Sequence, residues 1–423
     1  MSRIESPAER RQRLVDTHGY NGLALLTLYD GWRYFEPAEL DGFVAFELHR
    51  GTAVACGDPV CAEADVPVLL SLFAAYCTGR DWRFSFVGAS ARVGKIAAAL
   101  GMTVVKVGEE PFLDLSHSGL TGNAAKKARS AINLARRTGV TVEEYRDPSP
   151  AVDSEITAIA RDWLATRNSP PMGFLLRSRP LALREKKRIF IASHDDRIVA
   201  VLTCSLAPAR GLLYIEEQLR RPDAPYGTSE LLIDHARRAA RDSGLALLSL
   251  GTAPLHNAVQ QPYGTFRVLT LLFRALRARA NPVYNFASLA HFKKKFAPAF
   301  WEDTFLVCQG ASPRVALSVI AAFAPEGIAA VMLPRSLRWL RLVPAAALWS
   351  AGFAGVLLAG FMAWEFPDAL DPARLGIVTM FVARRPAEVM FDWAQVTVLA
   401  HRMISLGVMA AAGALFWQRR VRA

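Results

Sequence analysis

The sequence lacks several motifs that mark common enzyme classes. Its 423 residues contain no GxGxxG dinucleotide fingerprint, no P-loop, no HExxH zinc motif and no GxSxG nucleophile elbow. These absences count against dinucleotide dehydrogenases, kinases, zinc proteases and α/β-hydrolases. The first twenty residues are charged and contain no apolar run, so they do not resemble a secretory signal peptide.

Cysteine is also scarce. The five cysteines are an odd number and form no CxxC pair, so a zinc site or thioredoxin-type redox chemistry has no support in the sequence. Reduced thiols that fill core space are the ordinary interpretation of such cysteines. We therefore expect no metal site.

The chain is rich in positive charge and in apolar residues. Lys and Arg number 50 against 38 Asp and Glu, the formal net charge is +12, and hydrophobic residues make up 52%. The basic balance favours anionic partners, which include nucleic acid, phosphate groups and acidic membrane surfaces. The apolar content favours contact with a membrane. A chain of this length is expected to form two or three domains.

Residues 20–310 alternate short apolar strand patterns with helix patterns, which is typical of an α+β fold. A Pro-rich joint at residues 146–153 suggests a boundary between two halves. We therefore predict a first domain at 1–149, a second at 150–310, a linker at 311–341 and a membrane region at 342–423. The expected helices are 66–79, 90–100, 123–138, 151–166 and 228–242.

Residues 342–363 form a run of 22 residues without charge. As a helix they would span about 33 Å, enough for a bilayer core, so we predict a transmembrane helix; a buried soluble helix is the alternative. Residues 393–417 are a weaker second span because they contain His401 and Arg402, and an interfacial helix is the alternative. Flanking arginines predict a hairpin in the inner (cytoplasmic) membrane, with the first 310 residues facing the cytoplasm.

Residues 120–140 predict an amphipathic helix with a basic stripe of one sign. Ordinary solvated helix faces mix the two signs, whereas this stripe contains no acid. A solvated face remains the alternative to a surface that binds phosphates, of either a tRNA backbone or lipid headgroups. The stripe consists of Lys126, Arg129, Asn133, Arg136 and Arg137.

The stretch "YIEEQLRRPDAPYGTSELLIDH" predicts a strand, a tight turn and a helix. Strict alternation along the strand places Glu216 and Arg220 on a polar face and Glu217 on the apolar face. Thr228 is the expected N-cap of the helix, and Glu230 lies in its first turn, where the helix dipole stabilises an acid. The polar face of the strand could therefore line a cleft.

Two further stretches combine polar and aromatic residues. "LGTAPLHNA", residues 250–258, is a strand end followed by a loop, and Asn257 and His256 are candidates there. In residues 281–302, Lys293 and Lys294 lie among aromatic side chains. Such a mixture can bind single-stranded nucleic acid or lipid headgroups, and lysines that extend beside an aromatic core are the alternative.

Together these stretches resemble one family, the catalytic domain of the lysylphosphatidylglycerol synthases, also called multiple peptide resistance factors. The shared pieces occur in family order over residues 20–308: "GDP", "GEE", the basic helix, "RRPDAPYG", "LGTAPL" and "YNFASLAHFKKKF". The resemblance implies two tandem GNAT-like domains. It also implies transfer of an aminoacyl group from aminoacyl-tRNA to an anionic phospholipid such as phosphatidylglycerol, without metal or redox cofactor.

The resemblance also suggests roles for residues. By spacing, Glu216 takes the position of the Asp in the family's Asp–Leu–Met–Arg run, and Leu219 takes that of the Arg, which Arg220 could replace. Glu216 and Glu230 are expected to bind the aminoacyl ammonium group and to act in acid–base catalysis. Arg220 is expected to be the third catalytic residue, and it and Arg221 are expected to bind phosphate or to polarise the ester. The other residues expected to bind substrate, mostly through phosphates, are Asn257, Lys126, Arg129, Arg136, Arg137, Lys293 and Lys294.

Two other functions remain open from the sequence. The strand–turn–helix at 214–235 is also where GNAT enzymes bind the pyrophosphate of CoA, which suggests an acyl-CoA-dependent N-acyltransferase. Its turn, however, contains only one glycine, Gly227. A membrane-tethered module that binds RNA or lipid without catalysis is the other alternative. The sequence identifies neither the amino acid, nor the exact lipid, nor the oligomeric state.

Overall fold

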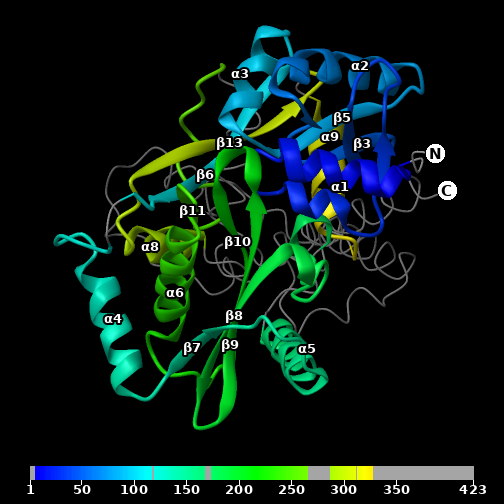
Figure 1. Ribbon diagram of the computed structural model, residues 1–423. Coiled ribbons are helices and arrows are strands. Elements are labelled where there is room, and N and C mark those ends of the chain that lie inside the picture. The colour runs from blue at the N-terminus through cyan, green and yellow to red at the C-terminus, as the bar shows by residue number, and fades with distance from the viewer. Residues whose placement is uncertain (1–4, 117–118, 167–172, 265–285, 311, 327–423) are drawn as a thin grey trace, which may run out of the picture. The chain divides into compact units, whose positions relative to one another are not determined.

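One continuous β-sheet organises the part of the chain that can be described. A computed structural model describes residues 5–116, 119–166, 173–264, 286–310 and 312–326. Their 13-stranded sheet runs in the order β1-β2-β3-β5-β13-β6-β11-β10-β9-β8-β7, with β4 beside β2 and β12 beside β6 (Figure 1). The strands are β1 Arg33–Phe35, β2 Gly42–His49, β3 Thr52–Cys56, β4 Val60–Cys61, β5 Arg83–Ala89, β6 Thr103–Asp114, β7 Thr141–Glu144, β8 Lys187–His194, β9 Arg197–Ala207, β10 Leu212–Arg220, β11 Leu247–Ser249, β12 Ala253–Pro254 and β13 Phe300–Cys308.

The five helices predicted from the sequence are confirmed, with ends that differ by at most three residues. Their apolar residues recur at helical spacing, and one face of each helix is buried. Together with the strands they confirm the expected mixture of helical and β structure. The described helices are α1 Pro7–His18, α2 Val66–Thr78, α3 Ala91–Ala99, α4 Lys126–Arg137, α5 Pro150–Ala165, α6 Thr228–Asp242, α8 Phe286–Lys294 and α9 Pro313–Phe323.

The earlier half of the sheet has an aromatic core beneath α2 and α3. Phe73 of α2 is fully buried, and its ring contacts the rings of Phe46, Phe84 and Phe86 from β2 and β5. Burial of one such side chain contributes about 1.5–3 kcal/mol. These contacts anchor the helices to the sheet.

The later half has a second core beneath α4 and α6. Ala128 and Ile132 of α4 pack with Leu232 of α6 and with Leu202 of β9. The two helices lie side by side (Figure 1). Thus α4, which precedes the expected boundary at 149/150, packs with strands that follow it. The sheet also continues across that boundary, because β6 pairs with β11 and β13.

Part of the expected linker at 311–341 is helical and packed. Pro313–Phe323 forms α9, whose Val315 and Ala322 are buried, and the Thr52 hydroxyl donates to the Ser318 hydroxyl at 3.0 Å. Burial of one face therefore ties this segment to the sheet. The predicted hairpin at 342–423 lies outside the described residues. Among the helices of the described residues, none combines the length and the apolar content needed to cross a bilayer.

Candidate active site

The parallel strands β10 and β11 separate near the middle of the sheet. They pair only from Leu212 to Tyr214 on β10 and from Leu247 to Ser249 on β11, and α6 connects them. Beyond Tyr214, β10 remains paired with β9 on one side, and no described strand pairs with its other side. Sites in α/β proteins commonly lie where the carboxyl ends of parallel strands separate. This edge of β10 is therefore the candidate site.

A β-bulge interrupts β10 at this edge. Its pairing with β9 shifts between Ile215 and Glu217, so that Tyr214 lies opposite Ser205 and Glu217 lies opposite Thr203. Ser205 and Thr203 are two positions apart on β9, so Tyr214 and Glu217 share a face. The prediction from strict alternation, which placed Glu217 on the opposite, apolar face, was therefore wrong. The extra residue of the bulge reverses the alternation after Ile215.

Glu216 is held by two buried donors on the Tyr214 face. Its Oε1 accepts hydrogen bonds from the Tyr29 hydroxyl and, at 2.9 Å, from Lys187 Nζ. The side chains of Lys187 and Glu216 are 0% and 7% exposed. Burial raises the pKa of Tyr29, and the Glu216 charge raises it further. Glu216 Oε2 is buried and has no hydrogen-bond partner among the described residues.

Glu217 lies on the same face but has a different environment. Its carboxylate accepts hydrogen bonds from the Ser178 hydroxyl and, at 2.7 Å, from the backbone N–H of Arg179. Burial raises the pKa of Glu217 to about 7, and the neighbouring Glu216 charge adds to the effect. A carboxyl group with a pKa near neutrality can both accept and release a proton at physiological pH.

A second buried cluster lies on the other side of Tyr214, at the end of β11. The Lys293 ammonium donates to the carbonyls of Gly251 and Thr252 at 2.6 and 2.8 Å, and burial lowers its pKa to about 7. The Ser249 hydroxyl donates to Glu110, whose pKa is raised by burial. Tyr214 interacts electrostatically with both Glu110 and Glu216, so the two clusters adjoin one another.

Glu230 is buried in the first turn of α6 and pairs with Lys295 Nζ at 3.2 Å. The predicted N-cap was wrong by one residue, because Gly227 caps the helix with φ of 91° and Thr228 is its first residue. A Cβ atom at Gly227 would lie 2.1 Å from the Ala131 carbonyl oxygen of α4. The close approach of two helices thus requires glycine at this position.

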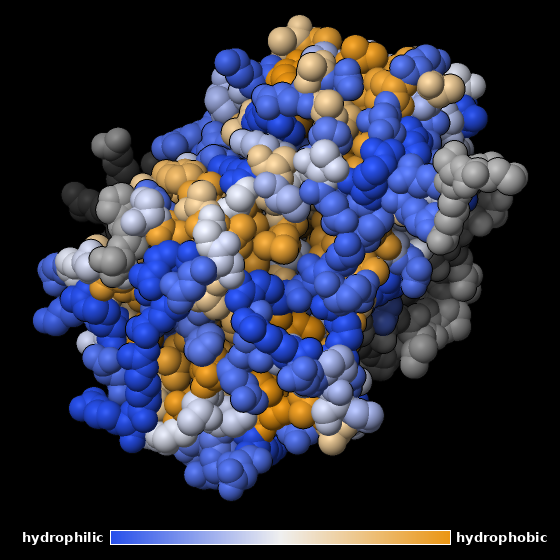
Figure 2. Space-filling view, in the orientation of Figure 1, coloured by the Kyte–Doolittle hydropathy of each residue, from blue (hydrophilic) through white to orange (hydrophobic). Residues whose placement is uncertain are grey.

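The predicted basic stripe follows the exposed side of α4, where hydrophilic side chains gather (Figure 2). Lys126 and Arg137 are exposed. Arg129 donates to the carbonyls of Leu120 and Gly122, and Arg136 pairs with Asp234 at 3.2 Å. The stripe is therefore only partly neutralised.

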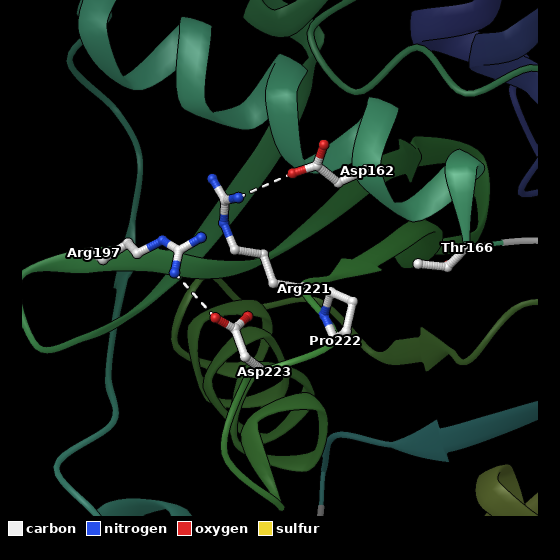
Figure 3. A pocket seen from close by; sticks show the side chains of 6 residues that line it. All are labelled: Asp162, Thr166, Arg197, Arg221, Pro222 and Asp223. Atoms are coloured by element: carbon white, nitrogen blue, oxygen red, sulfur yellow. Dashed lines mark hydrogen bonds and ion pairs between the residues drawn. The ribbon is translucent and has the colours of Figure 1, made fainter.

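The two arginines that follow the bulge have different environments. Arg220 is exposed, whereas Leu219, at the position where the resemblance expects arginine, is buried against Ile159. Arg221 donates to the Ile198 carbonyl at 3.0 Å and to Asp162 at 3.1 Å. It borders a cavity of about 310 Å³ at the end of α5, which is lined mostly by charged residues (Figure 3). The lining residues are Asp162, Thr166, Arg197, Arg221, Pro222 and Asp223.

Asn257 and Lys294 make other contacts. The Asn257 amide donates to both carboxylate oxygens of Glu109 at 3.1 Å, and Glu109 also binds Lys106 and His256. This network ties the loop after β12 to β6. Lys294 is exposed, and its ammonium lies 6.0 Å from the centre of the Trp301 ring. Neither residue forms a hydrogen bond or an ion pair with Glu216, whose partners are Tyr29 and Lys187.

Metal-ligating side chains do not cluster in the described residues, where no group of three or more His, Cys, Asp or Glu could hold a metal ion. All five cysteines are buried, and none forms a disulfide bond. The side chains described at the site are carboxylates, amines and hydroxyl groups.

Comparison with known proteins places this site in a family. The family model described as "Phosphatidylglycerol lysyltransferase, C-terminal" matches residues 11–308. The chain belongs to this family. The match includes the bulged strand, α4, α6 and α8, and so all the site residues named above.

Curated relatives are identical to this chain at about a quarter of the aligned residues. The Lysylphosphatidylglycerol biosynthesis bifunctional protein LysX of Mycobacterium avium is 26% identical over 70% of this chain and 25% of its own length. The Phosphatidylglycerol lysyltransferase of Staphylococcus aureus is 24% identical over 72% of this chain and 36% of its own length. The chain thus spans only about a quarter to a third of the length of these relatives.

Two solved structures have a similar fold. The L-PGS structure from Bacillus licheniformis has a TM-score of 0.63 at 21% identity and covers 76% of this chain and 96% of its own. A C-terminal domain (DUF2156) from Agrobacterium fabrum, described as belonging to a lysylphosphatidylglycerol synthetase, has a TM-score of 0.64 at 22% identity. It covers 76% of this chain and 98% of its own.

Several residues at the site were not predicted from the sequence. Lys187 and Tyr29 give no signal in the sequence because they contact Glu216 only in the folded chain. Glu217 was rejected on the assumption of a regular strand. Glu110 could have been found, since it is part of the "GEE" stretch that supported the family resemblance.

Proposed function

We propose that this chain transfers an aminoacyl group from an aminoacyl-tRNA to a hydroxyl group of an anionic phospholipid such as phosphatidylglycerol. Membership of the phosphatidylglycerol lysyltransferase family supports this activity. So do the names of the relatives from Mycobacterium avium and Staphylococcus aureus. Since the chain spans only part of those relatives, the activity is a proposal for this chain.

The reaction is a transesterification. The lipid hydroxyl oxygen attacks the ester carbonyl carbon, the bond between that carbon and the ribose oxygen breaks, and the hydroxyl proton ends on the ribose oxygen. The enzyme must bind the ammonium group of the aminoacyl residue and move one proton. It must also stabilise the negative charge on the carbonyl oxygen.

The observation on which the proposal rests most is the unpartnered Oε2 of Glu216. A buried carboxylate oxygen without a donor costs free energy, and an ammonium group supplies a donor of matching charge. Lys187 and Tyr29 already hold the other oxygen, so the orientation of the carboxylate is set before the substrate binds. We therefore assign to Glu216 the role of binding the aminoacyl ammonium group.

Other roles follow from the state of each group. Glu217, with its pKa near 7, is assigned to accept the proton of the lipid hydroxyl and then to donate it to the ribose oxygen. Lys293, which is buried beside Gly251, is assigned to stabilise the negative charge that develops on the ester carbonyl oxygen. Glu230 keeps its expected role as a second acid, and Lys295 holds its carboxylate.

Phosphate groups of either substrate are assigned to the cationic side chains outside the buried clusters. Some of these side chains are exposed, and others are partly paired with a carboxylate or a carbonyl. Such side chains can neutralise phosphate groups that stay in contact with water. These residues are Lys126, Arg129, Arg136, Arg137, Arg220, Arg221 and Lys294. Asn257, bound to Glu109, is assigned to hold the loop that borders the site.

We further propose that the chain acts at the cytoplasmic face of the inner membrane, held by a hairpin within residues 342–423. The sheet would then consist of two GNAT-like halves that meet at β6. The pairing of β6 with both β11 and β13 supports this junction, as does the packing of α4 with the later half.

The test is direct. The full chain in detergent is mixed with vesicles of phosphatidylglycerol and, in turn, with tRNAs charged with labelled amino acids, and the extracted lipid is examined for label. We expect one amino acid to appear in an alkali-labile lipid ester, and the Glu216→Gln variant to form this ester much more slowly. If no amino acid labels the lipid, the proposal is wrong.

An acyl-CoA-dependent N-acyltransferase is supported less well. A pyrophosphate group that binds at the start of α6 needs exposed backbone N–H groups there. The Ala131 carbonyl of α4, however, packs against Gly227 at this point. Tight binding of CoA measured by calorimetry would favour this rival. A non-catalytic binding module would show no labelled lipid, and Glu216→Gln would change its binding little.

A further inference from the structure

An exposed aromatic ring stands at the turn between β10 and α6. Tyr226 is 62% exposed, the largest value among the large hydrophobic side chains of the described residues that are exposed. The next residue, Gly227, has φ of 91° and packs against the backbone of Ala131. The turn is therefore fixed on α4, and the ring is presented to solvent from a rigid support.

The helix beside this ring has a cationic exposed face. Lys126, Lys127 and Arg137 are exposed, and α4 contains no acid. Among the described residues, Arg136 is the only cation of α4 paired with a carboxylate, that of Asp234. The face therefore keeps a net positive charge, which attracts a polyanion.

Nucleic acid fits this surface better than a membrane does. A helix that lies in a membrane surface inserts its apolar face into the lipid. The apolar face of α4, which includes Ala128, Ile132 and Ala135, is already buried in the protein core. What remains is a row of cations beside one flat ring, which is the combination that binds a phosphate backbone and stacks a base.

We propose that Tyr226 stacks on a base in the single-stranded 3′ end of an RNA whose backbone lies along α4. The proposal rests on the proposed function, in which the acyl donor is attached to an RNA 3′ end. The turn that contains Tyr226 joins the strand of Glu216 to the helix of Glu230. An RNA end held by the ring would thus lie near the first turn of α6, which contains Glu230.

The test measures RNA binding by the full chain in detergent, with fluorescence anisotropy. The probes are an RNA hairpin with a four-nucleotide single-stranded 3′ tail and the same hairpin with a blunt end. We expect the tail to strengthen binding by the wild type. Tyr226→Ala should weaken binding of the tailed hairpin about tenfold and leave the blunt hairpin unchanged, because stacking involves an unpaired base. Tyr226→Phe, which keeps the ring, should behave as wild type.

Charge reversal on α4 provides the complementary measurement. Lys127→Glu should weaken binding of both hairpins equally and reduce the slope of log K against log salt, because backbone contacts do not depend on the tail. Lys95→Glu, on the exposed side of α3 in the earlier half, is the matched control and should leave RNA binding unchanged.

Two outcomes would overturn the inference. One is a tail preference that survives in Tyr226→Ala. The other is a Lys127→Glu variant that binds RNA normally but no longer sediments with phosphatidylglycerol vesicles, which would make α4 a membrane surface. RNA binding as expected, with no label in the lipid assay, would instead contradict the proposed function alone.

Discussion

The carboxylates of Glu216 and Glu217 lie on the same face of the sheet, although they are neighbours in one strand. The bulge in β10 produces this arrangement by adding one residue opposite β9. Glu216 is ion-paired with buried Lys187, whereas Glu217 accepts hydrogen bonds from Ser178 and Arg179 and has a pKa near 7. Two identical side chains thereby acquire different chemistry from their surroundings.

Glu216→Gln should lower kcat/KM for aminoacyl-tRNA by roughly a hundredfold, because a charge-assisted hydrogen bond to the substrate ammonium contributes about 1.5–3 kcal/mol. Steady-state kinetics with labelled aminoacyl-tRNA would measure the change. Glu143→Gln, on the exposed side of β7, is the matched control and should stay within about twofold of wild type. An equal loss in both variants would show that Glu216 has no special role.

Glu217→Gln should be more stable than wild type at pH 8 and equally stable near pH 4.5. Burial raises the pKa of Glu217 from 4.5 to about 7, so the folded state holds a proton that the unfolded state releases. The wild type therefore loses stability as pH rises through this window, by about 3 kcal/mol at most. Glutamine has no charge to bury. Thermal unfolding at both pH values measures the difference; a gap that widens toward acid would contradict the prediction.

Lys293→Met should change how stability depends on pH above neutrality. Burial lowers the pKa of Lys293 from 10.5 to about 7, so the folded state lacks a proton that the unfolded state still binds. The wild type should therefore gain stability relative to Lys293→Met as pH rises from 7 toward 10, by about 1 kcal/mol per pH unit. Lys294→Met alters the exposed neighbour and is the control. The difference in stability between this variant and the wild type should not change with pH.

Gly227→Ala should destabilise the protein by more than Gly244→Ala. Both glycines have positive φ, which costs an alanine roughly 1–2 kcal/mol. At Gly227 the new Cβ would also lie 2.1 Å from the Ala131 carbonyl oxygen, whereas no atom lies within 4 Å of a Cβ at Gly244. We expect faster amide exchange across α4 in Gly227→Ala only. Equal exchange in the two variants would show that this contact does not hold α4.

Local sequence patterns were sufficient for much of the fold. The helices at 66–79 and 228–242 were predicted to within one residue because apolar spacing and turn residues act over a few positions. The candidate acids Glu216 and Glu230 also came from one continuous stretch. Helix α9 was not predicted, because residues 311–341 were expected to form a linker.

The sequence alone determined the family, the places of most helices and strands, and the stretch that contains Glu216 and Glu230, since these depend on the order and spacing of nearby residues. Only the tertiary structure decided which acids share a face and which groups hold them. Tyr29 is 187 positions from Glu216, and the bulge exists only in the pairing of β10 with β9. Such contacts form between residues that are far apart in the sequence, so the spacing of residues along one strand does not predict them.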